Sequence, residues 1–477
     1  MSLDAALAFA SISEIGKLYR RRKLSPVELT RFLLDRIARL NPRLNAYLAL
    51  NSEIALKDAS AAESALCSAP RRKSSRDLGP LYGIPISLKD NLHTAGLRTT
   101  GGSGFLRDFL PLQDAAVVTS LKNSGAILIG KTNLHEFAYG VTSNNPHFGP
   151  VRNPWDPDRI PGGSSGGSAA ALAAGLCYGS IGTDTGGSIR IPASLCGVVG
   201  LKPGLGRVSA EGAIPLSTTL DFVGPMARSV ADTALLFEAI AAPENNKRPS
   251  RAARGGHLRI GVPKHFFLDI VSPDIQQAFE SSLVTLKKLG TKLKEISLPY
   301  LKETEHAGNQ IAWAEATHYH QQAGWYPLHA ADYGEDVRSR LEMGEKVSAL
   351  EYLRALDLRE KFIAGFHLAL LENEVDALVT PTTPIAAPLI GEEKVSIGGK
   401  DHSTRALLLR LNRPANLGGL PAISVPCGLT PSGLPAGLQF LAAVNAESLL
   451  LDLAARFELA HPLNAHPDLT SIYADQQ

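Results

Sequence analysis

The 477-residue sequence has few cysteines and almost no net charge, and each shortage narrows the kind of protein that it encodes. Its four cysteines, Cys67, Cys177, Cys196 and Cys427, lie far apart and fit neither a disulfide framework nor a CxxC metal pair. We interpret them as buried thiols of a protein in a reducing compartment, so the expected location is cytoplasmic. The net charge of +2 argues against a dedicated nucleic-acid binder, which normally carries a basic face.

Long apolar runs are also missing. No stretch of about 18 apolar residues exists that would cross a membrane. The short apolar segment at 5–10 is followed by Lys and Arg, the reverse of a signal peptide. Hydrophobic residues still make up 44% of the chain, which is ordinary for a globular enzyme and too high for disorder. We therefore expect a monomer or homodimer with no nucleic-acid or membrane partner.

Local signals predict helices first and then an alternation of strands and helices. Ser-x-x-Glu at 11–14 and again at 25–28 has the pattern of a capping box. Apolar residues at helical spacing over 29–40 predict an amphipathic helix. Short apolar strands are predicted at 84–88, 126–129, 178–181, 259–262, 377–379 and 422–425. Helices are predicted between strands, for example at 115–124 after Asp114 and at 273–289 after Ser272. The alternation predicts an α/β fold around a largely buried sheet.

Three segments have compositions that are unusual for a packed core. They are 83–91, in which Lys89 ends an apolar strand; 161–168, with the sequence PGGSSGGS; and 182–190, with the sequence GTDTGGSIR. In the last segment two glycines precede Ser188. Glycine lets the backbone approach a substrate and turn its N–H groups inward, as an oxyanion hole requires. A tight turn has the same composition, so this segment alone leaves both interpretations open.

The other two segments are equally ambiguous when each is taken alone. The 161–168 segment has the composition of a flexible linker, but a strongly helix-forming alanine run follows it. A glycine-rich loop at a helix start presents free N–H donors, and this one lacks the Gly-Lys-Ser/Thr of a phosphate loop. Lys89 either reaches solvent from the strand end or is buried and neutral, in which state it is a general base.

Together the three segments resemble the amidase signature family. The strand-end lysine, the glycine–serine loop and the Thr-Gly-Gly-Ser motif occur in the family's order and at the family's spacing. Flanking segments at 129–137, 149–155, 197–203 and 420–426 extend the resemblance over most of the chain, and the part around 300–400 is the least similar.

The resemblance implies a Ser–cis-Ser–Lys triad and a small-molecule amide substrate, with no metal and no cofactor. Ser188 would attack the acyl carbon, Ser164 would follow a cis peptide bond and bridge the other two, and neutral Lys89 would accept the proton. The oxyanion hole would consist of the backbone N–H groups of Thr185, Gly186, Gly187 and Ser188. In supporting positions, Ser165 would donate a hydrogen bond, and Asp184 would pair with Arg190 to hold the loop.

The family's fold is a large mixed, mostly buried β-sheet covered by α-helices on both sides. We expect a single domain over 1–477, with N-terminal helices at 1–75, the signature core with the triad at 76–240, a variable helical substrate-facing region at 241–400 and a C-terminal return at 401–477. Surface connections are expected at 242–256 and 391–403. The aromatics Trp313, Tyr319, Trp325 and Tyr326 fit either a substrate pocket or the core.

The serious rival within the family is the glutaminase component of a glutamyl-tRNA(Gln) or aspartyl-tRNA(Asn) amidotransferase, its A chain. Such a component needs partner subunits and hands ammonia to a charged tRNA. These proteins carry an acidic residue at about the position of Leu409, where it would hold the amino group of glutamine, and leucine cannot do so. We therefore expect a stand-alone amidase with a less polar substrate, an amide, anilide or carbamate, which includes aryl acylamidase and urethanase activity.

Other classes fit the sequence less well. The segment 162–166 matches the Gly-x-Ser-x-Gly elbow of α/β-hydrolase esterases, which would use Ser164, but two prolines stand where that motif needs a strand. An aspartic protease needs a second Asp-Thr-Gly, which the chain does not contain. His318 and His320, with Glu315 nearby, lack the spacing of a zinc-binding helix. A binding module would have to keep both serines and the lysine at family spacing without using them.

Overall fold

The computed structural model describes residues 3–68, 78–242, 258–470 and 472. Helices α2 (Ile12–Arg20) and α3 (Pro26–Leu44) begin at the two predicted capping boxes. In each, the serine hydroxyl accepts a hydrogen bond from the backbone N–H of the glutamate, and the glutamate side chain accepts one from the serine backbone N–H. A third capping box, at 348–351, begins the long helix α12 (Ala349–Asn373).

Most strands belong to one large, largely buried sheet, and all six predicted strands are confirmed. Its eleven strands are β1 (Tyr47–Leu50), β2 (Pro85–Lys89), β3 (Ile127–Thr132), β6 (Gly179–Asp184), β7 (Val199–Lys202), β8 (Phe222–Ala227), β9 (Arg259–Pro263), β10 (Lys292–Ile296), β11 (Ala377–Pro381), β14 (Ala422–Leu429) and β15 (Pro435–Ala442). Two small pairs lie outside it: β4 (Asn144–Asn145) with β5 (Gly149–Pro150), and β12 (Lys394–Ile397) with β13 (Lys400–Ser403).

The sheet is mixed, in the order β1-β3-β2-β6-β8-β7-β14-β15-β11-β9-β10. Strand β2 runs parallel to both of its neighbours, β3 and β6. The carboxyl ends of these parallel strands therefore meet at one edge of the sheet, where loops commonly form a site. From β6 to β15 each neighbouring pair is antiparallel.

Helices cover both faces of the sheet, as the fold class predicts. The remaining helices are α1 (Leu3–Ala8), α4 (Ser52–Ser68), α5 (Ala116–Asn123), α6 (Gly166–Ala173), α7 (Arg190–Cys196), α8 (Val230–Ile240), α9 (Pro273–Lys288), α10 (Glu303–Gln322), α11 (Glu335–Gly344), α13 (Thr404–Arg410), α14 (Arg413–Leu417) and α15 (Glu447–Ala460). Helices α8, α9 and α15 share a core cluster with Ile423 and Phe440. The adjacent residues Ala422 and Leu441 point to the other face and pack in the cluster that includes α12 and α14.

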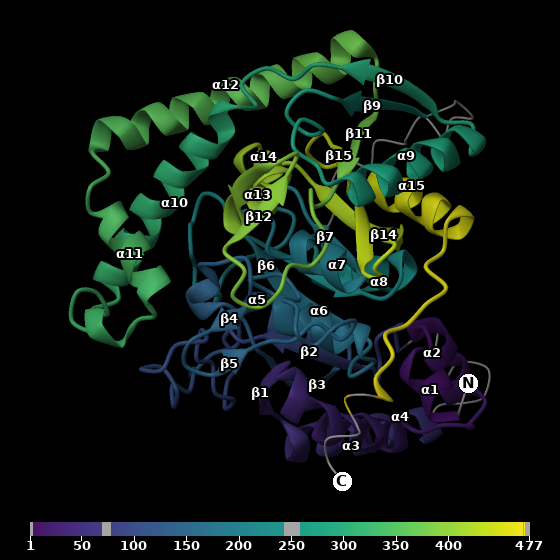
Figure 1. The fold of residues 1–477 in the computed structure, drawn as a ribbon. Helices are drawn as coiled ribbons and strands as arrows, with labels where there is room; N and C mark the ends of the chain where they lie inside the picture. The colour runs from purple at the N-terminus through teal and green to yellow at the C-terminus, as the bar shows by residue number, and fades with distance from the viewer. Residues whose placement is uncertain (1–2, 69–77, 243–257, 471, 473–477) are drawn as a thin grey trace.

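The two ends of the chain lie on the same side of the molecule (Figure 1). After α15 the chain runs back toward the N-terminal helices, where the rings of Phe9 and His466 stack with centroids 3.9 Å apart. Leu469 and Ile472 join the core cluster that contains α2 and α3. On the opposite side, α10 contacts α11, α12 and α14, so the helical 300–373 region borders the α13–α14 segment.

Several sequence-based expectations need correction. The 391–403 segment, predicted as a loop, contains the β12–β13 hairpin, because Gly398 and Gly399 adopt the positive φ angles (59° and 76°) of a two-residue turn. Asp114 does not cap α5; it accepts a hydrogen bond from the Ala95 N–H and pairs with Lys122. Similarly, the Ser272 hydroxyl contacts Asp274 and makes no cap hydrogen bond.

Of the four free cysteines, Cys67 is exposed on α4 and only the other three are buried. The connection predicted at 242–256 lies, after its first residue, outside the described residues. No helix in the described ranges is long and apolar enough to cross a membrane.

Close packing of α7 on the sheet depends on Gly437. A Cβ at this position would lie 2.7 Å from Ser194 Cβ and 3.0 Å from Ser194 Cα. We expect Gly437→Ala to lower the free energy of unfolding by about 1–3 kcal/mol, because the helix must move to make room. Chemical denaturation measures this. The matched control is Gly16→Ala in α2, where the nearest atom lies 3.4 Å away and alanine favours the helix. Equal effects of the two substitutions would contradict the packing argument.

Candidate active site

Lys89 is the last residue of β2 and its side chain is completely buried. Its Nζ lies 2.7 Å from Ser164 Oγ and 2.8 Å from Thr183 Oγ1. Thr183 is on β6, the parallel neighbour of β2, and the sequence did not identify it. Burial is the main influence on Lys89 and lowers its pKa to about 7, although Asp221 and Asp184 favour its charged form.

Ser164 lies in the loop before α6, after a cis peptide bond from Gly163. Both Ser164 and its neighbour Ser165 are buried. Ser165 joins this loop to β6 and to the loop after it, because its hydroxyl donates to the Thr183 carbonyl (3.1 Å) and its N–H donates to the Ser188 carbonyl (3.1 Å).

Ser188 lies in the loop at 185–189, here called the Ser188 loop, which connects β6 to α7. Gly187 has a φ of 123°, a conformation that favours glycine, and a Cβ there would clash with Asn412. The Gly187 N–H donates to Asp184 Oδ1 at 2.8 Å. This contact corrects the expectation that Gly187 contributes to an oxyanion hole, since its donor is already used.

The other predicted donors differ from Gly187. Within the described residues, the N–H groups of Thr185, Gly186 and Ser188 donate to no protein acceptor. All three residues line a cavity of about 420 Å³. The Ser188 hydroxyl likewise makes no hydrogen bond to any described residue, and Ser164 and Ser188 are connected only through the Ser165 backbone. The structure therefore contains the Lys89–Ser164 contact and a Ser188 that faces a cavity.

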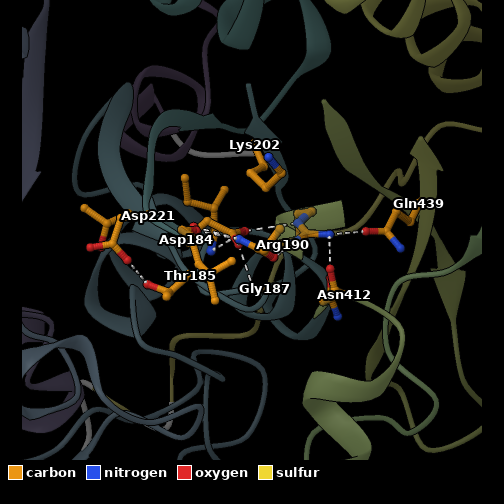
Figure 2. A network of polar contacts seen from close by, with 12 residues as sticks. Asp184, Thr185, Gly187, Arg190, Lys202, Asp221, Asn412 and Gln439 are labelled. Carbon is orange, nitrogen blue, oxygen red and sulfur yellow. Dashed lines mark hydrogen bonds and ion pairs between the residues drawn. The ribbon is translucent and has the colours of Figure 1, made fainter. Parts of the chain in front are cut away.

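Asp184 and Arg190 form the predicted ion pair, and both side chains are fully buried. Arg190 donates to the carboxylate through Nε and Nη2, each at 3.0 Å. Its remaining donors reach Asn416, the Asn412 carbonyl and Gln439 (Figure 2). Burial alone would raise the pKa of Asp184, but the Arg190 guanidinium holds it well below its usual range.

Asp221 was not identified from the sequence. It stands immediately before β8, the antiparallel neighbour of β6, and accepts a 2.5 Å hydrogen bond from the Thr185 hydroxyl (Figure 2). It also accepts from the N–H groups of Leu216 and Ser217. Burial raises the pKa of Asp221 to about 6. An aspartate at a strand start beside the Ser188 strand was the available signal, but the pairing of β6 with β8 is needed to interpret it.

The cavity beside Ser188, here called the inner cavity, has walls from distant parts of the chain. Its lining residues are Ala138, Tyr139, Gly140, Val141, Thr185, Gly186, Ser188, Leu216, Leu220, Asn309, Ala312, Trp313, Arg405, Leu409 and Arg413. A larger outer cavity shares Gly140, Val141 and Arg405 with it and extends to α11 and the β12–β13 hairpin. Of the four aromatics considered above, Trp313 lines the inner cavity, while Tyr319, Trp325 and Tyr326 pack in an aromatic core cluster.

The structure also places the residues of the competing interpretations. No strand precedes Ser164 in the described chain between β5 and α6, so it does not lie on a strand–turn–helix elbow. Glu315 accepts hydrogen bonds from Ser217 and Thr219. His320 is buried against the Tyr333 hydroxyl, whereas His318 is exposed.

Comparisons with known proteins agree with this architecture along nearly the whole chain. A family model described as Amidase matches residues 28–451. The A chain of the glutamyl-tRNA(Gln) amidotransferase from Moorella thermoacetica is 37% identical, over 95% of this chain and 96% of its own. Among solved structures, an amidase is 35% identical with a TM-score of 0.85, covering 94% of this chain and 99% of its own. The native peptide amidase from Stenotrophomonas maltophilia is 30% identical with a TM-score of 0.81, covering 97% of this chain and 99% of its own. The chain therefore belongs to the amidase signature family and is an amidohydrolase acting on carbon–nitrogen bonds.

Proposed function

We propose that the protein is a stand-alone amidase that hydrolyses a small-molecule amide through an acyl-enzyme on Ser188. One observation carries the proposal: a buried lysine with a pKa of about 7 lies 2.7 Å from Ser164 Oγ, next to the loop that presents Ser188 to the inner cavity. A base whose pKa is close to the working pH transfers protons most effectively.

The reaction follows from the order of these groups. Ser188 Oγ attacks the amide carbon and gives its proton to Ser164 Oγ, while Ser164 passes its own proton to neutral Lys89. The tetrahedral intermediate then expels the amine, which receives the proton back through the same two residues. A water molecule attacks the acyl-enzyme by the same route and releases the carboxylic acid. The Ser164–Ser188 hydrogen bond forms when substrate is bound, as catalytic contacts often tighten at that stage.

We assign oxyanion stabilisation to the N–H groups of Thr185, Gly186 and Ser188, because they line the inner cavity and donate to no described acceptor. Gly187 has a different role. Its N–H holds the Asp184 carboxylate, and this contact together with the Arg190 pair fixes the shape of the Ser188 loop.

The alternative is a glutaminase component of a tRNA amidotransferase, the kind of protein that the Moorella relative's name describes. Leu409 argues against it. Its side chain packs beside Gly186 in the inner cavity, where an apolar group offers nothing to the amino group of glutamine. We also propose a cytoplasmic location, supported by four cysteines that are all free, one of them exposed.

Replacing the three proposed catalytic residues tests the mechanism. Ser188→Ala and Lys89→Met should each lower kcat by roughly 10⁴-fold or more, because nucleophile and base act as one unit. Ser164→Ala should lower kcat by roughly 10²- to 10⁴-fold, since water can substitute in part for the relay. Steady-state kinetics with an aryl amide measures these effects. Ser180→Ala is the matched control, because that buried hydroxyl on β6 has no partner among the described residues. Wild-type activity in Lys89→Met at neutral pH would refute the mechanism.

The pH dependence of kcat/KM should reveal the lysine. Because Lys89 must be neutral to accept a proton, kcat/KM should rise with pH and level off above about pH 7. In Asp221→Asn the nearby anion that favours the protonated amine is lost, so the pKa of Lys89 should fall and the rise should move to lower pH. A rise at the same pH in both proteins would assign the titration to a group other than Lys89.

A substrate panel separates the stand-alone amidase from the glutaminase component. The purified chain alone should hydrolyse simple aryl or alkyl amides, and anilides, carbamates and esters should be included to define the leaving group. The same protein should show little glutaminase activity. Glutamine hydrolysis that appears only after partner proteins are added would favour the alternative.

A further inference from the structure

The inner cavity has an unbalanced charge. Among its lining residues the only charged side chains are two arginines, Arg405 and Arg413. No carboxylate of the described residues lines this cavity. A guanidinium in a confined space normally pairs with an acid, since burying an uncompensated charge is costly.

Arg405 lies on α13, one turn before Leu409, so the two side chains share one side of the helix. Its Nε is buried without a hydrogen-bond partner, and no ion pair joins Arg405 to any acid in the described chain. The acid with the clearest influence on Arg405 is Asp336, which is already engaged by His135 at 2.8 Å and Arg340 at 2.9 Å. Arg405 therefore has a positive charge and an N–H donor that remain available to a ligand.

Tyr139 supplies a second unused polar group in the same cavity. Its side chain is only 2% exposed, and its hydroxyl has no hydrogen-bond partner among the described residues. Arg405 and Arg413 both lie close enough to influence it electrostatically. A buried hydroxyl left without a partner costs free energy unless a ligand completes it.

Arg413 brings the second positive charge beside the Ser188 loop. A Cβ built at Gly186 would lie 3.7 Å from its Nε and 3.8 Å from its Nη2. Its Nη1 is occupied by the Glu305 carbonyl and Asn309. Arg340, by contrast, is already satisfied by the Tyr139 carbonyl and Asp336.

The environment of these arginines disfavours their charge. Burial, followed by repulsion from Arg340 and Arg413, lowers the pKa of Arg405 to about 9, and burial lowers that of Arg413 to about 10. Both guanidinium groups still carry their protons at neutral pH. An anion placed between them would relieve the repulsion and supply the missing acceptor.

We infer that the inner cavity binds an amide that also carries a carboxylate, and that this carboxylate accepts hydrogen bonds from Arg405 and the Tyr139 hydroxyl, with Arg413 close by. The inference rests on the proposed function, because it names the substrate class of the site at Ser188. Leu409 lies between the two arginines in sequence, and no acid of this cavity is available for an ammonium group. Monoamides of dicarboxylic acids therefore fit better than glutamine, which carries an amino group as well.

Kinetics tests this substrate class directly. For the wild-type protein, kcat/KM should be higher for glutaric acid monoamide than for pentanamide, the neutral amide of equal chain length, and higher than for glutamine. Arg405→Gln and Tyr139→Phe should each reduce this preference, Arg405→Gln by on the order of 10- to 100-fold, the effect of losing a hydrogen-bonded charge partner. Arg410→Gln is the matched control: Arg410 is on the same helix but donates to the Phe266 carbonyl, and its substitution should leave the preference unchanged. An equal or greater kcat/KM for pentanamide would overturn the inference and leave amide hydrolysis intact.

A binding measurement separates this inference from the proposed mechanism. Calorimetry with the Ser188→Ala protein should show that glutarate binds more tightly than pentanoate, and Arg405→Gln in that background should abolish the difference. This result would support the carboxylate site even if the wild-type protein cleaved no amide, an outcome that would refute only the proposed function. Equal affinity for glutarate and pentanoate would overturn the inference whatever the kinetics.

Discussion

The arrangement of the whole site depends on one buried ion pair, between Asp184 and Arg190. Two fully buried charges are tolerated only when each is paired and hydrogen-bonded on every side, and this pair meets that condition with contacts that reach far along the chain. The carboxylate holds the N–H groups of Gly187 and Ile189, which shapes the Ser188 loop. The guanidinium holds Asn412, Asn416 and Gln439, which belong to the α13–α14 segment and to β15. The pair therefore connects the loop that presents Ser188 to the segment that forms the opposite wall of the cavity.

Lys89 shows the opposite use of burial. Its neighbour on β3, Lys131, is equally buried but lies 3.4 Å from the carboxylate of Asp90 and donates to the Leu92 carbonyl. Lys89 has no carboxylate within ion-pair distance in the described chain; its closest partners are the hydroxyls of Ser164 and Thr183. The pKa values follow this difference, about 8 for Lys131 and about 7 for Lys89. Two adjacent strands thus hold one lysine that is tied into the structure and one that is available to exchange a proton.

What the sequence predicted correctly was local. The two capping boxes and the six strands depend on neighbouring residues, and the Asp184–Arg190 pair lies within one short segment. What it missed depends on segments that meet only after folding. The Gly187 N–H is used by a carboxylate three residues away, and a motif does not reveal which way an N–H points. Asp221 acquires meaning only when β8 pairs with β6. Arg405, Leu409 and Arg413 recur at a spacing of four residues, which was visible, but Tyr139 and Trp313 come from other parts of the chain to the same cavity.

The origin of the cavity walls bears on how such a protein diversifies. Lys89, Ser164 and Ser188 stand on strand ends and loops in the middle of the sheet, whereas Trp313 and Leu409 belong to α10 and α13, which approach from outside it. Mutations in those two helices alter the shape and charge offered to a ligand without moving the proton path. A lineage can in this way acquire a new growth substrate through a few changes on peripheral helices, while selection keeps the centre of the sheet constant.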